Sequence, residues 1–499
     1  MPGRKLYNTN PRGVFGDVAA ISLHGEPYQQ IREVGGITTH IDSNDTLRQL
    51  AKNARYKELL PAKIFAVEPF LSDLFEKDGY YGIQRKIEQG ASLTFEEAFS
   101  LATFVCIGLN IPLREVIGER LKNKMPEDTH LLQATALLAA MSTKEAYVGL
   151  TAAEIAGLVA ATVHLDTVVR TECENPVIAF GGMGGDKGYP LNGHATKLFS
   201  LSTLAAIILS ADTPVHKHHS YPNTSKVAGQ SAIEAFGARS DFQTEASLGD
   251  TFHASQLLMT SCHMTRTLHT LSHKLKGETV NHVVGPLSFT MSAKTPLHAM
   301  IGVNEKIHPS VIVDALAILS QKGFQRYENS AVYCGTLTSS RGADVLDPAL
   351  MKHIVVLDEV APPPYDSIVS FLVEGKNAGT FVLSPEDFYD TDTLRSFVPE
   401  ALAIPNDRHA IMEANTSAIT GENMTRARYL AMTVGLGLFV RHCLGDPQAL
   451  DMNNHRVHRQ MLRACTQRGL DLILSGKGRE QLEKYIAASN VHAGEKGDV

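Results

Sequence analysis

The stretch Ala179–Gly237 reads AFGGMGGDKGYPLNGHATKLFSLSTLAAIILSADTPVHKHHSYPNTSKVAGQSAIEAFG, and it decides the fold. Its glycine-rich run, Gly181–Asp186, follows a short apolar segment of the kind that forms a buried strand. Leu198–Thr203 then opens an apolar helix, and Pro214–His219 indicates a second strand end, followed by a polar loop. This succession of strand, loop, helix, strand, loop and helix predicts an α/β sheet domain.

The glycine-rich run has the chemistry of an anion-binding surface. Glycines let backbone amides approach an anion closely, and a helix N-terminus adds partial positive charge. The later loop Asn223–Lys226 supplies hydroxyls and a lysine that complete a phosphate cradle. The order Gly-Gly-Met-Gly-Gly-Asp is neither GxGxxG nor a Walker motif, so this loop alone also fits a plain tight turn. The whole stretch predicts a phosphate-binding floor.

Three histidines surround a lysine at the end of the second predicted strand, as His216, Lys217, His218 and His219. Alternation along a strand places His216 and His218 on one face. A metal site is disfavoured, because no cysteine or carboxylate stands at ligand spacing nearby. The cluster therefore predicts the polar lining of a phosphate or base pocket.

Two adjacent carboxylates, Asp358 and Glu359, follow the apolar run Ile354–Leu357. Carboxylates at a strand end favour Mg²⁺, which prefers hard oxygen ligands and accompanies phosphates. The dipeptide by itself also fits a solvated loop, so its weight comes from its combination with the glycine-rich run.

The composition is that of an ordinary globular protein. The 499 residues are 43% hydrophobic and 20% charged, a size that predicts two or three domains. A net charge of −7 disfavours nucleic acid as a partner. The six cysteines are scattered without a CxxC motif, and we find neither a signal peptide nor a membrane-length apolar run. We expect a soluble protein of a reducing, cytoplasmic compartment.

Three segments are predicted along the chain. Residues 1–80 form an extension of unknown role, with weak signals for a strand at Ala19–Leu23 and a helix at Asp42–Tyr56. Residues 81–170 predict a helical bundle domain, whose helices begin at the capping boxes Thr94–Glu97 and Thr151–Glu154. Residues 171–490 predict the α/β domain, with the C-terminal helices included.

The α/β domain is predicted in more detail. The expected strands are Val177–Ala179, Val280–Val284, Ala299–Val303, Ala331–Tyr333 and Ile354–Val356. The expected helices are Lys197–Ser210, Gly229–Phe236, Ser255–Lys274, Pro309–Lys322 and the amphipathic segments 423–445 and 455–487. We also expect a hairpin over Ile368–Leu383 and a helix start at Ser384–Phe388.

This ordered series of motifs resembles the anthranilate phosphoribosyltransferase family and, more distantly, the pyrimidine-nucleoside phosphorylases of the same fold. Over roughly residues 80–490 the series is a helical bundle, GGMGGD, LFSLST, HKHH, NTSK, GQSAIEAFG, VGPLSFTMSAKTPLHAMIGV, LDEV and LSPEDF. The resemblance implies a small helical domain and a large α/β domain, with the active site in the cleft between them.

Carried over residue by residue, the resemblance implies a complete site. The residues implied to bind phosphoribosyl pyrophosphate (PRPP) are Gly182, Gly184, Gly185, Asp186, Ser200, Ser202, Thr203, Lys217, Ser225 and Lys226. Ser202, Asp358 and Glu359 are implied to bind Mg²⁺. Lys217 and His218 are the implied catalytic residues, and His218, His219 and Tyr221 would line the acceptor pocket.

The chain departs from the family pattern around the acceptor. His219, Ser220 and Tyr221 stand where the family has glycine, asparagine and arginine, and Ser200 replaces an asparagine. Glu278 stands at the position of a family arginine before the Gly285-Pro286 turn, and an insertion of roughly 20 residues lies around residues 337–354. The phosphoribosyl half of the site is therefore predicted to be kept and the acceptor half to be divergent.

The leading hypothesis is Mg²⁺-dependent transfer of a phosphoribosyl group from PRPP to an aromatic or heterocyclic nitrogen, as in tryptophan biosynthesis. Lys217, the loop amides and Mg²⁺ would stabilise the departing pyrophosphate, and a histidine would accept a proton. The alternatives are a nucleoside phosphorylase, which needs no metal pair, and a non-catalytic or nucleic-acid-binding relative. The expected partners are small-molecule substrates and a second copy in a homodimer, with no membrane.

Overall fold

The computed structural model of the chain describes residues 77–109, 127–165, 170–184, 189–191, 194–196, 198–219, 227–240, 242, 245–261, 279–337 and 356–491. The predicted strand at 19–23, the predicted helix at 42–56, Glu278 and nearly all of the insertion lie outside these residues. Among the candidate site residues, the same holds for Gly185, Asp186, Tyr221, Ser225 and Lys226.

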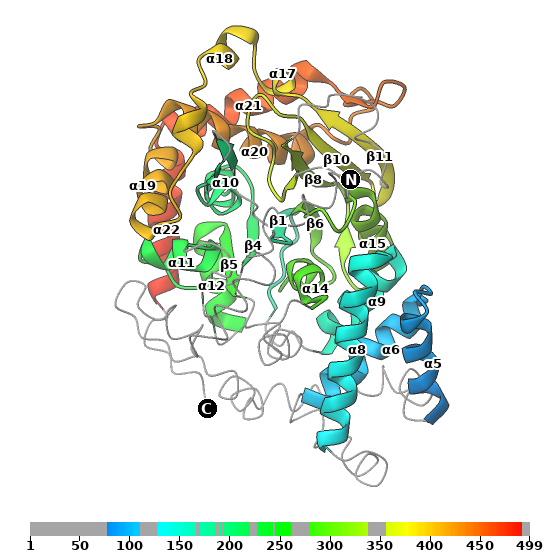
Figure 1. Cartoon of the computed structure of the whole chain (residues 1–499). Coiled ribbons are helices and arrows are strands. Elements are labelled where there is room, and N and C mark those ends of the chain that lie inside the picture. Colours follow the sequence, from blue (N-terminus) through cyan, green and yellow to red (C-terminus); the bar gives the residue numbers. More distant parts are fainter. Residues whose placement is uncertain are drawn as a thin grey trace.

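A sheet of nine strands forms the centre of the described part (Figure 1). Its main path runs β11-β10-β8-β6-β1-β4-β5, in which β8, β6, β1, β4 and β5 are parallel and β10 is antiparallel to both its neighbours. These strands are β1 (Val177–Gly182), β4 (Val215–His219), β5 (Leu257–Ser261), β6 (Pro296–Gly302), β8 (Ser330–Thr336), β10 (Ser367–Val373) and β11 (Lys376–Leu383). The short strands are β7 (Arg326–Tyr327) on β6, β9 (Val356–Leu357) on β8, and two separate pairs, β2 (Tyr189–Leu191) with β3 (His194–Thr196) and β12 (Leu450–Asp451) with β13 (Arg456–Val457).

Helices cover both faces of the sheet, as parallel strands require. The N-terminal helices are α5 (Lys77–Glu88), α6 (Phe95–Leu109), α8 (Glu127–Tyr147) and α9 (Ala152–Leu165), and Figure 1 shows them gathered at one end of the molecule. The helices between strands are α10 (Leu201–Leu209), α11 (Gly229–Ala235), α12 (Glu245–Ser255), α14 (Asn281–Leu287) and α15 (Pro309–Gln321). The C-terminal helices are α17 (Pro385–Phe388), α18 (Thr391–Arg395), the 3₁₀ helix η4 (Pro399–Leu402), α19 (Arg408–Ile419), α20 (Met424–His442), α21 (Arg459–Leu474) and α22 (Lys477–Val491).

The sheet separates two hydrophobic cores. Alternate residues of β1 point to opposite faces, so that Val177 and Ala179 lie in one core and Ile178 and Phe180 in the other. The first core also contains the helical layer α5–α9 together with α14 and α15, and the second contains α10 and α19–α22. The first core includes residues of both the N-terminal helices and the sheet, so it does not separate the two predicted domains. The domain boundary near residue 170 therefore stays a prediction.

The predicted capping boxes are confirmed at the starts of α6 and α9. The Thr94 amide donates to Glu97 Oε2 (3.0 Å), and the Glu97 amide donates to Thr94 Oγ1 (3.2 Å). The same reciprocal pair joins Thr151 and Glu154, at 2.8 and 3.3 Å. Each box satisfies two amides that the first turn of a helix leaves without intrahelical partners.

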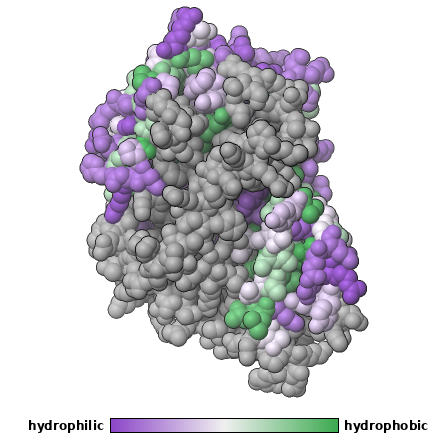
Figure 2. Space-filling model, viewed as in Figure 1, coloured by the Kyte–Doolittle hydropathy of each residue, from purple (hydrophilic) through white to green (hydrophobic). Residues whose placement is uncertain are grey.

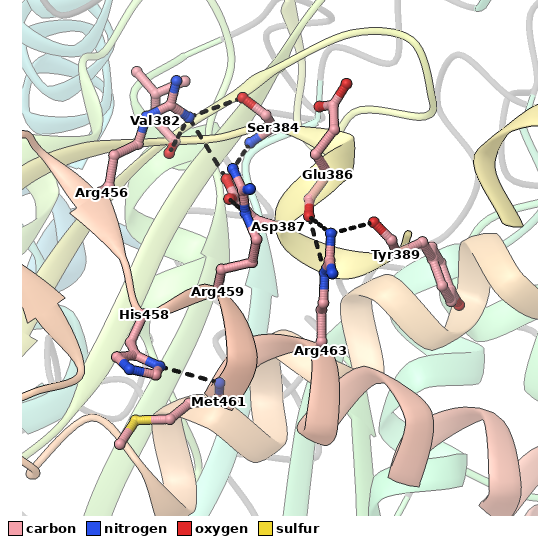
Figure 3. Close-up of polar contacts among 10 residues, drawn as sticks. All are labelled: Val382, Ser384, Glu386, Asp387, Tyr389, Arg456, His458, Arg459, Met461 and Arg463. Carbon is pink, nitrogen blue, oxygen red and sulfur yellow. Dashed lines mark hydrogen bonds and ion pairs between the residues drawn. The ribbon is translucent and has the colours of Figure 1, made fainter. Parts of the chain in front are cut away.

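The helix start predicted at Ser384 is also confirmed, and Figure 3 shows how α17 is held. Asp387 is 2% exposed, accepts a hydrogen bond from the Ser384 amide (2.8 Å) and forms an ion pair with Arg459 (3.1 Å). Arg463 donates to the carbonyls of Glu386 (2.7 Å) and Tyr389 (2.9 Å). The LSPEDF motif therefore fixes the end of β11 against α21.

Two element predictions are wrong. The segment Val280–Val284 belongs largely to α14, not to a strand, because a short buried apolar run does not distinguish a strand from a helix by periodicity. A helix was expected to begin at Ser255, but Ser255 is the last residue of α12. The residues that follow, Leu257–Ser261, form strand β5. Gln256 has a φ of 56°, which ends the helix and turns the chain into the sheet.

The C-terminal predictions are corrected in detail. The segment 455–487 holds β13 and two helices, α21 and α22, with a break at Gly476, whose φ of 80° ends a helix. The segment 423–445 is a helix, but not an amphipathic one, since α20 is buried on most sides between α10, α19 and α21. In the described part of the chain, no helix combines the length and apolar character needed to cross a membrane.

Candidate active site

The carboxyl ends of the parallel strands meet at one edge of the sheet, and most described candidate residues lie there. In the register of the sheet, Lys217 on β4 is opposite Phe180 on β1, and Gly182 on β1 is opposite Gly302 on β6. This edge is where α/β sheets bind ligands, because the loops that leave the strands surround a crevice. The glycine-rich run and the histidine–lysine cluster are thus brought together by the order of the strands.

Two glycines let the Asp358–Glu359 loop lie against the ends of β1 and β6. A Cβ built on Gly302 would lie 1.8 Å from the Asp358 carbonyl oxygen, and one on Gly182 would lie 3.4 Å from Asp358 Oδ2. Gly184 has a φ of 68°, a left-handed conformation that favours glycine. Gly182 and Gly302, at the ends of β1 and β6, therefore leave the room that the Asp358–Glu359 loop occupies.

The loop after Glu359 is held by groups that sequence reasoning missed. Tyr429 Oη on α20 donates to the Val360 carbonyl (2.7 Å), and the Ala361 amide donates to Ser367 Oγ (2.8 Å). No local sequence signal marks either partner. The carboxylate pair is thus positioned by the second core and by β10.

Lys217 lies among the carboxylates beneath this edge and is 5% exposed. Burial lowers its pKa, while the charges of Glu359 and Asp358 oppose that shift. Burial, and then repulsion from Asp358, raises the pKa of Glu359 to about 8, although Lys217 and a hydrogen bond with Ser202 act in the other direction. Three predicted residues, Lys217, Ser202 and Glu359, therefore form one electrostatic group.

The carboxylate pair fits a divalent cation that arrives with its ligand. Glu359 Oε2 is buried and has no hydrogen-bond partner, which is the state of an oxygen that awaits a ligand. Among the described residues, no group of three or more His, Cys, Asp or Glu is placed to hold a metal. Mg²⁺ is commonly bound by one or two carboxylates plus water and substrate phosphates, so a carboxylate pair is a sufficient protein contribution to such a site.

The start of α10 is held by an interaction that sequence reasoning also missed. The Ser200 amide donates to Asn415 Oδ1 (2.8 Å), and Asn415 Nδ2 donates to Ser200 Oγ (3.2 Å), across 215 residues of sequence. Asn415 on α19 is fully buried. It sets the first turn of α10, which carries Ser202 and Thr203.

The predicted alternation in β4 is confirmed, and it separates the three histidines. His216 Nε2 lies 2.9 Å from the hydroxyls of both Thr260 and Thr290, and His218 Nδ1 lies 3.1 Å from Thr260 Oγ1. Burial lowers the pKa of His218 to about 3 and that of His216 well below its ordinary value. His218 is therefore a neutral group in a network on the opposite face of the strand from Lys217.

His219 lies on the same face of β4 as Lys217. A Cβ on Gly229 would lie 2.9 Å from His219 Cβ and 3.0 Å from Thr203 Oγ1, so the imidazole lies where α10 and α11 begin. Its side chain is buried, and neither ring nitrogen has a hydrogen-bond partner. Burial lowers its pKa well below the ordinary value, which leaves a neutral ring with one donor and one acceptor.

The arrangement joins a buried cation, a carboxylate pair with an unsatisfied oxygen, hydroxyls at a helix start and a neutral imidazole. Such a set has the chemistry needed to bind a phosphate-bearing substrate together with a divalent cation. The fold brings five predicted site residues together, namely Gly182, Ser202, Lys217, Asp358 and Glu359. Thr203 lies beside His219. His218 lies on the opposite face of β4, where it contacts Thr260.

Comparison with known proteins bears on this arrangement. No family model matches the chain. The anthranilate phosphoribosyltransferase of Pyrococcus abyssi is 28% identical over 306 residues, which are 61% of this chain and 74% of that protein.

Two solved structures share the fold. The anthranilate phosphoribosyltransferase from Thermus thermophilus has a TM-score of 0.56 at 19% identity, covering 82% of this chain and 99% of that one. The Saccharomyces cerevisiae enzyme, in complex with PRPP and Mg, has a TM-score of 0.57 at 15% identity, covering 84% and 99%.

Fold and sequence together define an enzyme of the glycosyltransferase class, with the α/β architecture of the pentosyltransferases. The resemblance found in the motifs is thereby confirmed: the chain is similar in sequence to anthranilate phosphoribosyltransferases and shares their fold.

Proposed function

We propose that this chain transfers the 5-phosphoribosyl group of PRPP to an aromatic or heterocyclic nitrogen in a Mg²⁺-dependent reaction. The observation that carries the proposal is the electrostatic group of the buried Lys217 with Asp358 and Glu359 at the carboxyl edge of the sheet. The name of the Pyrococcus abyssi relative, and the PRPP and Mg bound by the yeast enzyme of the same fold, support it.

In this proposal the donor lies over the glycine-rich run and the start of α10. The hydroxyls of Ser202 and Thr203 bind its phosphates, helped by the partial positive charge of the helix start. Gly185, Asp186, Ser225 and Lys226, which lie outside the described residues, stay predicted donor-binding residues. The Lys217 ammonium stabilises the charge of the leaving pyrophosphate in a site of low dielectric, where such stabilisation is strongest.

Asp358 and Glu359, with the Ser202 hydroxyl, would hold the Mg²⁺ ion. A bound ion would neutralise charge on the donor phosphates and so assist departure of pyrophosphate. The buried, unpartnered Glu359 Oε2 supports this assignment, since a protein rarely leaves a carboxylate oxygen in that state without a ligand.

The acceptor would meet the face of β4 that carries His219. A neutral imidazole with two unpartnered nitrogens can accept a proton from the attacking nitrogen or orient it by a hydrogen bond. Tyr221, outside the described residues, stays a predicted neighbour of this pocket. We assign His218 an indirect role, because its hydrogen bond goes to Thr260 on the other face.

Calorimetry tests the proposal. PRPP should bind the full-length chain with Mg²⁺ present and should bind at least about tenfold more weakly when the ion is removed with a chelator. Turnover is then assayed with a panel of aromatic amines and nucleobases. Phosphate-dependent cleavage of a nucleoside would indicate a phosphorylase instead, and absence of any PRPP binding would overturn the proposal.

The assembly expected is a homodimer through the helical layer. Four large apolar side chains on or just beyond α5 and α8 are more than half exposed, namely Tyr81, Leu132, Tyr147 and Val148. Figure 2 shows hydrophobic surface over this layer. Exposed apolar patches commonly mark protein interfaces, and light scattering that gives a monomer mass would contradict the dimer. We also propose a reducing, cytoplasmic setting, because the six cysteines are scattered without a CxxC motif.

A further inference from the structure

Two cysteines far from the candidate site face each other between α20 and α21. The sulfur atoms of Cys443 and Cys465 are 3.6 Å apart. Cys443 is the residue at which α20 ends, and Cys465 lies in the second turn of α21. A disulfide bond needs its sulfurs about 2.05 Å apart, so the two sulfurs must move closer together before a bond can form.

The packing of the two helices keeps this pair in place. A Cβ on Gly435 of α20 would lie 2.6 Å from Thr466 Cα, and one on Gly469 of α21 would lie 2.8 Å from Val434 Cγ1. The two helices therefore pack closely at Gly435 and Gly469. Thr466 follows Cys465 directly, so this close contact also holds the Cys465 backbone.

The two thiols differ in access. Cys443 is partly exposed at the helix end, whereas Cys465 is 8% exposed. Burial, followed by the neighbouring Cys443, raises the pKa of the Cys465 thiol to about 12. A small oxidant in solution therefore reaches Cys443 first and leaves Cys465 as the second thiol.

We propose that Cys443 and Cys465 are a redox modification site that forms a reversible disulfide with hydrogen peroxide as the oxidant. One peroxide oxygen is transferred to the Cys443 sulfur to give a sulfenic acid, and the other oxygen leaves as water. The Cys465 sulfur then attacks the Cys443 sulfur, the S–S bond forms, and the sulfenic hydroxyl leaves as a second water. Two thiols and one peroxide thus give one disulfide and two waters, and a dithiol reverses the step.

Peptide mapping of the full-length chain tests the proposal. Trypsin cleaves after Arg441, Arg456, Arg463 and Arg468, so the two cysteines fall in separate peptides, His442–Arg456 and Ala464–Arg468. After peroxide treatment and capping of free thiols, we expect a species with the summed mass of both peptides. Dithiothreitol should remove it. Failure to find this species, or linkage of Cys443 to a different cysteine, would overturn the proposal.

Variants separate the roles of the two thiols. Cys443→Ser should abolish the linked species, and Cys465→Ser should leave a sulfenic acid on Cys443 that dimedone traps. Cys334→Ser, which removes a buried cysteine of β8, is the matched control and should keep the link. The oxidised wild-type chain should unfold about 2–5 °C above the reduced chain, because the bond closes a loop of the unfolded state. A lower unfolding temperature on oxidation would contradict the claim that the fold presets the pair.

Discussion

Two buried lysines lie among carboxylates in this protein, and their surroundings differ. In the helical layer, Lys144 Nζ lies 2.8 and 2.9 Å from the two carboxylate oxygens of Glu154, and both side chains are fully buried. Glu154 also accepts from the amides of Leu93 (2.9 Å) and Thr151 (2.8 Å). Each carboxylate oxygen of Glu154 therefore accepts a hydrogen bond from Lys144 and another from a backbone amide. A buried charge needs such a complete set of partners.

At the sheet edge, Lys217 faces two carboxylates in place of one. Glu359 keeps an oxygen without a hydrogen-bond partner, and burial and Asp358 raise its pKa to about 8. The difference teaches that a buried ion pair does not by itself mark a site. The informative feature is a buried charge whose partners are incomplete, because a ligand can supply the missing ones.

The largest expected effect is on stability and comes from the satisfied pair. Lys144→Met should lower the free energy of unfolding by about 3–5 kcal/mol, because it leaves Glu154 buried without its cation. Urea denaturation measures this change. Lys322→Met is the matched control, since Lys322 pairs with Glu96 where both side chains are about half exposed, and it should cost at most about 1 kcal/mol. Equal effects of the two substitutions would remove the contrast.

The second effect concerns catalysis at the unsatisfied group. Asp358→Asn combined with Glu359→Gln should lower turnover by about 10²–10³-fold and abolish the Mg²⁺ dependence of PRPP binding, since neutral amides hold the ion poorly. The free energy of unfolding should fall as well, because the buried Lys217 loses the carboxylates that stabilise its charge, so binding and turnover are measured well below the unfolding temperature of the variant. Unchanged donor binding and turnover in this variant would refute the metal assignment.

The third effect is a pH dependence of stability. The folded protein raises the pKa of Glu359 from 4.5 to about 8, so it retains a proton that the unfolded chain releases. Stability from this group is present below about pH 4.5 and is lost as the pH rises toward about 8. Glu359→Gln should therefore gain stability relative to wild type between about pH 5 and 8 in urea titrations. Parallel pH curves for the two proteins would show that Glu359 is not buried as described.

The smallest effect probes how the site is positioned. Asn415→Ala removes both hydrogen bonds to Ser200 at the start of α10. We expect a loss of about 1–2 kcal/mol in the free energy of unfolding and a rise of KM for PRPP by about threefold to tenfold, with kcat little changed. Thr416→Ala, one residue further along α19 on its exposed side, serves as the control for both measurements. A fall in kcat with KM unchanged would argue against a positioning role.

Local sequence patterns were sufficient for much of the fold. The capping boxes at Thr94 and Thr151 depend on groups three residues apart, and β4 shows its alternation within five residues. The patterns were insufficient at Val280–Val284 and after Ser255, where short apolar runs fit a strand and a helix equally well. There the choice depended on which neighbour each run pairs with.

The residues of the candidate site also fall into those that sequence patterns predicted and those that they missed. Gly182, Lys217 and the Asp358–Glu359 pair were predicted from their residue types and from the order of motifs. Asn415, Thr260 and Tyr429 were not, because each contacts its partner across a long stretch of sequence and carries no motif of its own. Alternation predicted that His216 and His218 share a face, but the prediction that His218 and His219 line one pocket did not follow from it, because neighbouring strand residues point to opposite faces.

The sequence by itself determined which groups this protein carries and where its helices begin, because helix caps, glycine turns and strand alternation are interactions between near neighbours. Only the tertiary structure decided which charges are satisfied. The parallel sheet brings the ends of β1, β4 and β6 to one edge and lowers the Asp358–Glu359 loop onto Gly302 and Gly182. Burial in that place, and not residue type, raises the pKa of Glu359 and leaves its oxygen open to a ligand.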